Sequence, residues 1–241
     1  MRAETRHQLK TDRFTQATIG AAEATAHWTA EHKSKLAAGI AIAAVVVAAV
    51  LGGWYYFGQQ DDKANLELTK AVRTLQTPVR PAGAPATPNA PSFASAQERA
   101  GAAKKQLQDV VDKYPHTHTA DIARYLLGTT AAELGDKATA ERQLKDAADT
   151  RNSDLAALAK MALAAFYGNN GRTKEAADIY RQLIDKPSTT VSKVMAQMQL
   201  ASLYESSQQP LEAKRVYEQI VKENPKSEAE GMAQAKLQAM K

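Results

Sequence analysis

The chain contains no cysteine among its 241 residues, and only 6% of its residues are aromatic. Without cysteine there can be no disulfide bond, no cysteine-ligated zinc and no thiol catalysis. The sequence also lacks a glycine-rich phosphate-binding loop, a glycine-flanked nucleophilic serine and a carboxylate pair set apart from ordinary helix surfaces. We therefore predict that the protein is not an enzyme and has no catalytic residue, cofactor or metal.

Strong charge of one sign is also missing. The formal net charge is +5, and no block of lysine and arginine is interleaved with aromatic residues, so nucleic acid is not an expected partner. His116 and His118 flank Thr117, with Asp121 nearby. Histidines so close together in a loop are more often solvated than metal ligands.

One long apolar run is present, from Leu36 to Phe57, and it carries no charge. At about 1.5 Å per helical residue it reaches roughly 33 Å, enough to cross a hydrocarbon core of about 30 Å. A cleaved signal usually has a shorter apolar region after a short basic start, although small residues such as Gly52 and Gly53 leave cleavage open. A core helix of this length would need a large domain around it. We predict a retained transmembrane helix over residues 36–57 that contacts the lipid bilayer.

The flanks of this run predict its orientation. Lysines and arginines precede it from Arg2 to Lys35, whereas Asp61 and Asp62 follow it. Because positive charge is retained in the cytoplasm, residues 1–35 are expected to be a cytoplasmic segment and the rest of the chain extracytoplasmic. Aromatic residues, which favour the headgroup level, gather at the outer end of the run as Trp54, Tyr55 and Tyr56.

Beyond the run, residues 58–77 are predicted to be a helical stem and residues 78–92 a linker. The linker is rich in proline and alanine, and a stretch with so much proline cannot sustain a helix or a central strand. We expect it to be extended and to be cut first by proteases. It holds five of the nine prolines of the chain, namely Pro78, Pro81, Pro85, Pro88 and Pro91.

From residue 93 to residue 241 the chain is rich in helix formers and repeats itself. Segments beginning at Tyr125, Met161 and Met198 align without gaps, at offsets of 36 and 37 residues. In each segment a small residue is followed four positions later by a bulky one, a pattern that lets two antiparallel helices pack closely. These pairs are Ala140 with Leu144, Ala176 with Tyr180, and Ala213 with Tyr217.

These repeats resemble the tetratricopeptide family, with Tyr167 and Tyr204 where that family often has tyrosine and Pro225 where it often ends a repeat. Residues 96–115 resemble the second helix of an earlier repeat, whose first helix would be residues 64–76. The resemblance implies an all-α fold, in which a single N-terminal transmembrane helix precedes an α-solenoid of about three to four helix pairs. Residues 227–240 would form a terminal capping helix.

The chain departs from that family at one position near the start of each repeat. The family usually has a large apolar residue there, whereas this chain has Arg124, Lys160 and Gln197. The sequence therefore leaves open which way the first helix of each pair faces.

A basic N-terminus, one apolar span and an outward tetratricopeptide domain together resemble the bacterial family that contains the ancillary subunit of the SecYEG translocon, whose relatives include the TPR domain of a cell division coordinator. The resemblance implies an adapter in the bacterial inner membrane that binds client peptides, the translocon or envelope complexes. The alternative is a structural scaffold or dimerising spacer that acts mainly through its transmembrane helix. A stripe of small residues from Ala37 to Gly52 would allow such association as a homo-oligomer.

In tetratricopeptide domains the first helices line a concave groove, and the resemblance maps that groove onto aligned residues here. No basic residue stands at these positions, which argues against a clamp for a terminal carboxylate. Methionine adapts to varied apolar side chains. Alternatively, Tyr125, Met161 and Met198 could be core residues between helices. The candidate groove consists of Ile122, Tyr125, Thr129, Leu158, Met161, Ala165, Met195, Met198 and Ser202.

Overall fold

The structure is a computed structural model that describes residues 33–81, 83 and 92–240. Most of the expected cytoplasmic segment, residues 1–35, and of the expected linker, residues 78–92, lies outside the described residues. The chain divides into two units, residues 1–56 and 57–241, and each unit is described by itself.

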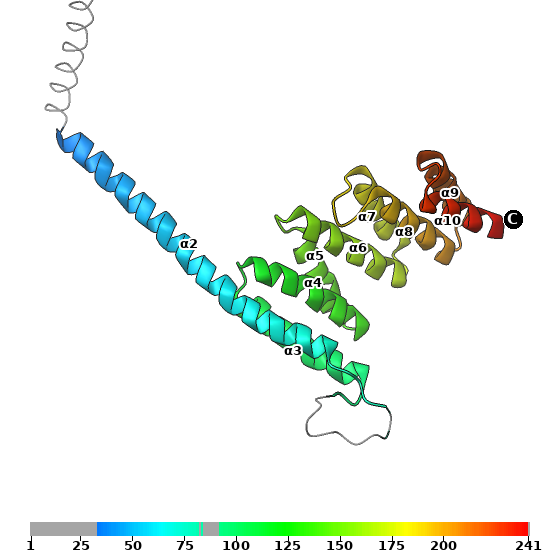
Figure 1. Cartoon of the computed structure of the whole chain (residues 1–241), viewed down its shortest axis with the longest axis horizontal. Coiled ribbons are helices and arrows are strands. Elements are labelled where there is room, and N and C mark those ends of the chain that lie inside the picture. The colour runs from blue at the N-terminus through cyan, green and yellow to red at the C-terminus, as the bar shows by residue number, and fades with distance from the viewer. Residues whose placement is uncertain (1–32, 82, 84–91, 241) are drawn as a thin grey trace, which may run out of the picture. The chain divides into compact units, whose positions relative to one another are not determined.

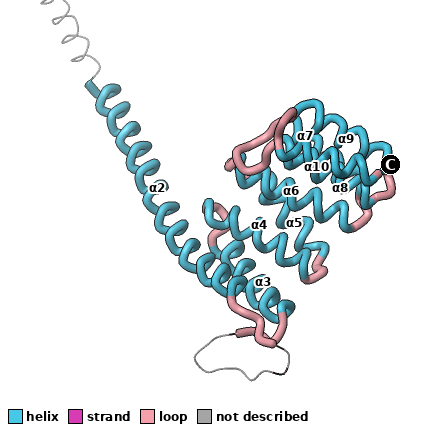
Figure 2. The backbone as a smooth tube through the Cα atoms, turned by 45° about the vertical axis from the view of Figure 1, so that its right-hand side comes forward, coloured by secondary structure: helices cyan, strands magenta, loops and turns pink. Residues whose placement is uncertain are grey.

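The described residues are helical throughout, with short turns between the helices and one isolated pairing of Val79 with Phe93 (Figure 2). The predicted all-α fold is confirmed. The helices are α2 (Lys33–Gln76), α3 (Ala96–Lys113), α4 (His118–Glu133), α5 (Lys137–Ala148), α6 (Ser153–Asn169), α7 (Thr173–Asp185), α8 (Lys193–Ser206), α9 (Pro210–Glu223) and α10 (Glu228–Ala239).

Helix α2 contains the apolar run and continues without a break to Gln76. Among the described residues it is the one helix that is long and apolar enough to cross a membrane, and none of its most apolar window is buried. A core helix of a soluble domain would bury that window, so a core role for this segment does not fit.

In the second unit, the last part of α2 serves as the first helix of the first pair. Ala64, Leu68 and Ala71 recur at helical spacing and are buried in one apolar cluster with Leu107 of α3 and Leu127 of α4. One helix therefore continues from the apolar run into the first repeat.

The α2–α3 connection is closed at its base. The backbone N–H of Arg80 donates to the carbonyl of Phe93 at 3.0 Å, and the N–H of Phe93 donates to the carbonyl of Pro78 at 3.0 Å. The guanidinium of Arg99 also donates to the carbonyl of Thr77 at 3.3 Å. The two ends of the proline-rich stretch are thus held together, whereas the composition alone predicted an extended linker.

The remaining helices form antiparallel pairs, α4 with α5, α6 with α7 and α8 with α9, followed by α10 (Figure 1). Each helix packs mainly on the helix before it and the helix after it. The first helices of successive pairs also touch, α4 with α6 and α6 with α8. This arrangement is a solenoid, in which each pair buries apolar surface against its neighbours.

The small and large residues of the repeat meet in the core as their spacing predicts. Ala140, Ala176 and Ala213 are fully buried, and Tyr217 is 1% exposed. Burial of the Tyr180 hydroxyl raises its pKa to about 12. The core therefore runs from pair to pair through the second helices as well as the first.

Glycine is needed where the helices of a pair meet most closely. A Cβ atom at Gly128 of α4 would lie 2.6 Å from Cγ of Leu144 in α5. Gly135 and Gly171, in the turns between paired helices, both have φ of 76°. The aligned turn of the fourth pair, between α8 and α9, has Gln208 with φ of 58° instead, a conformation that costs a side-chain-bearing residue about 1–2 kcal/mol.

Candidate protein-binding surface

The first helices α4, α6 and α8 share a stripe of uncharged residues that recurs at helical spacing. Because these helices touch one after another, the stripes join into one surface, here called the first-helix surface. Its residues are Ile122, Leu126 and Thr129 on α4, Leu158, Ala162 and Ala165 on α6, and Met195, Gln199 and Ser202 on α8.

Met195 is the most prominent apolar residue of this surface, because 46% of it is exposed. Ala165 and Ser202 are also exposed, whereas Ile122 and Leu158 are partly buried. The first-helix surface is therefore shallow and neutral, with small side chains beside larger apolar ones.

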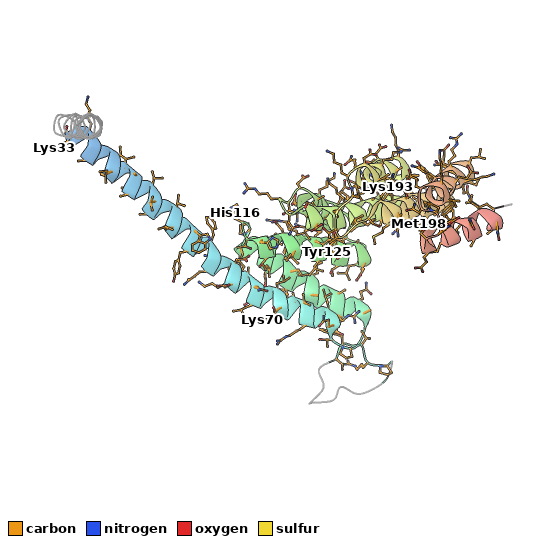
Figure 3. All side chains as sticks on the ribbon, turned by 45° about the horizontal axis from the view of Figure 1, so that its top comes forward. Lys33, Lys70, His116, Tyr125, Lys193 and Met198 are labelled. Atoms are coloured by element: carbon orange, nitrogen blue, oxygen red, sulfur yellow. The ribbon has the colours of Figure 1, made fainter. Side chains whose placement is uncertain are left out.

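Three of the predicted groove residues pack partly into the core. Tyr125, Met161 and Met198 are partly buried and pack against the largest apolar cluster of the solenoid. Figure 3 labels Tyr125 on α4 and Met198 on α8. Gln199, one residue after Met198, is exposed instead.

Sequence alignment alone missed Leu126, Ala162 and Gln199. All three stand one position after a predicted groove residue. Gln199 follows Met195 by four residues, and Ser202 follows Gln199 by three, which is the spacing of one helix face. Extending the helical period from Met195 would have found Gln199.

Three polar residues stand where the family usually has a large apolar residue, and two of them are bonded to nearby groups. The guanidinium of Arg124 donates to Asp121 at 2.7 Å and to the carbonyl of Pro115 at 2.6 Å. The side-chain amide of Gln197, which is 1% exposed, donates to Glu223 of α9 at 2.8 Å. Polar bonds to flanking groups thus replace the apolar packing that the family usually has at this position.

A family model described as a tetratricopeptide repeat-like domain matches residues 27–179, and a model described as a tetratricopeptide repeat matches residues 195–227. The chain belongs to the tetratricopeptide repeat-like family. The first match covers all of α2, helices α3 to α6 and the first part of α7, in agreement with the packing of α2 in the first repeat. No curated protein and no solved structure matches the chain.

Two charged residues of α8 form ion pairs with other helices of these tetratricopeptide repeats. Lys193 at the start of α8 lies 3.0 Å from Glu223 of α9, and Glu205 near its end lies 3.0 Å from Lys236 of α10. Hydrogen bonds from Gln219, Gln197 and Lys193 lower the pKa of Glu223 to about 2. The pairing directs these charges toward neighbouring helices and leaves the first-helix surface neutral.

The repeat tyrosine of the third pair, Tyr167, sits in a polar network between α5, α6 and the start of α7. Its hydroxyl donates to Glu141 at 3.0 Å, and the Arg172 guanidinium lies 3.8 Å from its ring centroid. Arg172 also donates to Glu141 at 2.8 Å. The hydrogen bond from Lys145, followed by those from Arg172 and Tyr167, lowers the pKa of Glu141 to about 2. This network ties the second and third tetratricopeptide pairs together.

The two histidines of the α3–α4 turn line an open cleft. His116 and His118 border it with Asp121 and Asp149. Asp121 is engaged by Arg124 at 2.7 Å and by the hydroxyl of Thr150 at 2.6 Å. Across the part of the chain that the structure describes, no group of three or more histidine, aspartate or glutamate residues is placed to hold a metal ion.

Proposed function

We propose that this tetratricopeptide protein is a membrane-anchored adapter whose first-helix surface binds apolar segments of other proteins. The observation that carries the proposal is the neutral surface that runs across α4, α6 and α8. Tetratricopeptide domains generally mediate protein–protein interaction, and this surface offers a partner segment apolar contacts with no charge to desolvate.

The side chains of this surface favour a partner with varied apolar residues. Met195 is unbranched and polarisable, and Leu158 and Ile122 stand at the aligned positions of α6 and α4. Ala165 and Ser202 leave room beside them for side chains of the partner. Burying apolar area contributes roughly 25 cal/mol per Å², so such a surface supports modest affinity for many sequences.

Substituting Met195 tests the proposal, because this side chain is 46% exposed. The probe is a fluorescein-labelled, terminally blocked peptide of alternating leucine and serine, with affinity measured by anisotropy on the full chain in detergent micelles. We expect Met195→Ser to weaken binding about fivefold, the scale of one partly buried apolar side chain. Thermal stability should stay nearly unchanged.

Leu211 of α9 provides a control, since it is 73% exposed and lies on a second helix, outside the first-helix surface. Leu211→Ser should bind the peptide like the wild type. Met198→Ser should instead lower the unfolding temperature, because Met198 packs against the core. Equal weakening by Met195→Ser and Leu211→Ser would refute the proposal.

We further propose that residues 36–57 span the bacterial inner membrane, with the N-terminus in the cytoplasm and the solenoid on the periplasmic side. The basic residues before the span and Asp61 and Asp62 after it support this topology. A reporter that works only outside the cytoplasm should be active when fused after Lys241 and inactive when fused before Met1. The opposite pattern would contradict the topology.

The arrangement of span and repeats resembles the family of the ancillary translocon subunit, and on that resemblance we propose a role in protein translocation or envelope assembly. Photo-cross-linkers at Met195 and at Ala44 separate this role from that of a scaffold acting through its span. An adapter should cross-link to translocating or unassembled proteins from Met195. Cross-links to membrane helices from Ala44, with none from Met195, would favour the scaffold.

A further inference from the structure

A second site lies between the two helices of the third pair. It is an open cleft of about 710 Å³, bounded by the first half of α6, the last turn of α7 and the loop that follows α7. Its apolar lining comes from Ala156, Ala157 and Leu183, and Lys160 lies among them. The cleft is large enough to admit a side chain of a partner protein.

The cleft coincides with the departure from the family pattern. Lys160 stands where the family usually has a large apolar residue, which would occupy the space between the paired helices. At the aligned positions, Arg124 is bonded to Asp121 and to the carbonyl of Pro115, and Gln197 is bonded to Glu223. The polar side chain is therefore bonded within the protein at two of the three aligned positions, although the buried Oε1 of Gln197 accepts no hydrogen bond from the described residues.

Lys160 differs from both, although it is partly buried. No ion pair or hydrogen bond joins its ammonium group to any residue within the described ranges 33–81, 83 and 92–240. The other charges lining the cleft are Asp154, Asp185 and Lys186. The Asp154 carboxylate already accepts from the N–H of Thr189 at 3.1 Å and from its hydroxyl at 3.3 Å, while Asp185 and Lys186 are exposed.

We propose that this cleft binds the carboxylate of a glutamate or aspartate side chain in an extended segment of a partner protein. The ammonium group of Lys160 binds the carboxylate, and Ala156, Ala157 and Leu183 contact the methylene groups of the same side chain. A monoanion suits the site better than a phosphate group, because Asp154 and Asp185 would repel a second negative charge. The site deepens the proposed function, since it adds an acidic residue to the segment that the adapter binds.

The experiment compares two terminally blocked peptides, acetyl-Ala-Leu-Glu-Leu-Ala-amide and the same peptide with glutamine in place of glutamate. Binding is measured by calorimetry on the full chain in detergent micelles. We expect the glutamate peptide to bind about tenfold more tightly, the scale of a charge-assisted hydrogen bond. The preference should shrink as salt is raised, because ions screen the pair.

Substitution of Lys160 should abolish that preference. In Lys160→Met and Lys160→Gln both peptides are expected to bind equally, and the unfolding temperature should not fall because Met restores an apolar side chain. Lys174→Met is the matched control, since it removes an exposed cation of the same helix pair outside the cleft. An undiminished preference in both Lys160 variants would overturn the proposal.

Two further measurements identify which kind of anion the cleft binds. The glutamine peptide with a free C-terminal carboxylate should bind no better than its amide, and millimolar inorganic phosphate should not displace the glutamate peptide. A gain from the free terminus, or displacement by phosphate, would overturn the assignment to a side-chain carboxylate. Met195→Ser should weaken both peptides and keep their ratio, so failure of this site and failure of the first-helix surface are distinguishable.

Discussion

The first and second helices of the repeats are built from different residues. Helices α6 and α8 carry two charged residues each, Asp154 and Lys160 in one and Lys193 and Glu205 in the other. Their partners α7 and α9 are charged along their outer faces, with buried residues confined to one side. In α6 the buried residues run from Leu155 to Tyr167 around much of the helix, whereas α9 buries only Ala213, Tyr217 and Ile220.

This difference follows from the number of neighbours. A first helix contacts its own partner, the second helix of the preceding pair and the first helices on either side, whereas a second helix packs chiefly on the helices before and after it. Fewer solvent-facing positions leave less room for charge, because an unpaired charge is costly to bury. The faces that α6 and α8 leave open are consequently poor in charge.

The largest expected effect breaks the close approach of a first helix to its second helix. Gly128→Ala places a methyl group 2.6 Å from Cγ of Leu144, and such overpacking typically costs about 1–3 kcal/mol. The measurement is the free energy of unfolding in urea.

Gly101 of α3 is the control, because a Cβ there meets nothing within 4 Å. Gly101→Ala should leave stability unchanged or raise it by up to about 1 kcal/mol, since alanine favours a helix more than glycine does. If both alanine variants lost the same stability, close packing at Gly128 would not be the cause.

An intermediate effect on stability is expected at Glu141, a charged residue of the second helix α5. The pKa of Glu141 is lowered from its ordinary value of 4.5 to about 2 by Lys145, Arg172 and Tyr167. A lowered folded-state pKa stabilises the protein above about pH 4.5, and this stabilisation is lost as the pH falls toward 2. Because Glu141 is partly open to solvent, its contribution is on the order of 1 kcal/mol.

Glu141→Gln should therefore destabilise the protein at pH 7 and flatten the fall in stability between pH 4.5 and 2. Urea unfolding at several pH values measures both. Glu218→Gln, on the exposed side of α9 with Lys214 at 3.9 Å, should leave the pH dependence as it is in the wild type. A slope identical in Glu141→Gln and the wild type would show that the Tyr167 network does not support the fold.

The smallest effect is expected at the turns between first and second helices, where one turn has glutamine and the other two have glycine. Gln208 has φ of 58° where the aligned residues are Gly135 and Gly171. Gln208→Gly removes the cost of the positive φ, but it also raises the conformational entropy of the unfolded chain. The net gain in the free energy of unfolding should therefore be up to about 1 kcal/mol. Thermal unfolding measures it, with Gly171→Ala expected to lower stability. If Gln208→Gly lowered the unfolding temperature, the glutamine side chain would stabilise the fold by more than its positive φ destabilises it.

The first-helix surface was only partly predictable from the sequence. Alignment placed Met195, Ala165 and Ser202 on the open face, and the structure exposes all three. It left open whether Tyr125, Met161 and Met198 face the groove or the core, and in the structure these residues pack against the core. A helix advances 100° per residue, so adjacent positions such as Met198 and Gln199 can exchange core and solvent with a small rotation. Only packing against neighbouring helices sets that rotation.

The sequence by itself determined the helix pairs, their order and the long apolar run, because these depend on local propensity and on a repeating period of apolar and small residues. Tertiary structure decided what depends on contacts between distant residues. It packed the last part of α2 into the first repeat through Ala64 and Leu68, and it closed the proline-rich connection through Val79 and Phe93. Among the described residues it also left the Lys160 ammonium group without a hydrogen bond or ion pair while bonding Arg124 and Gln197, because whether a polar side chain finds a partner depends on groups that only folding brings within reach.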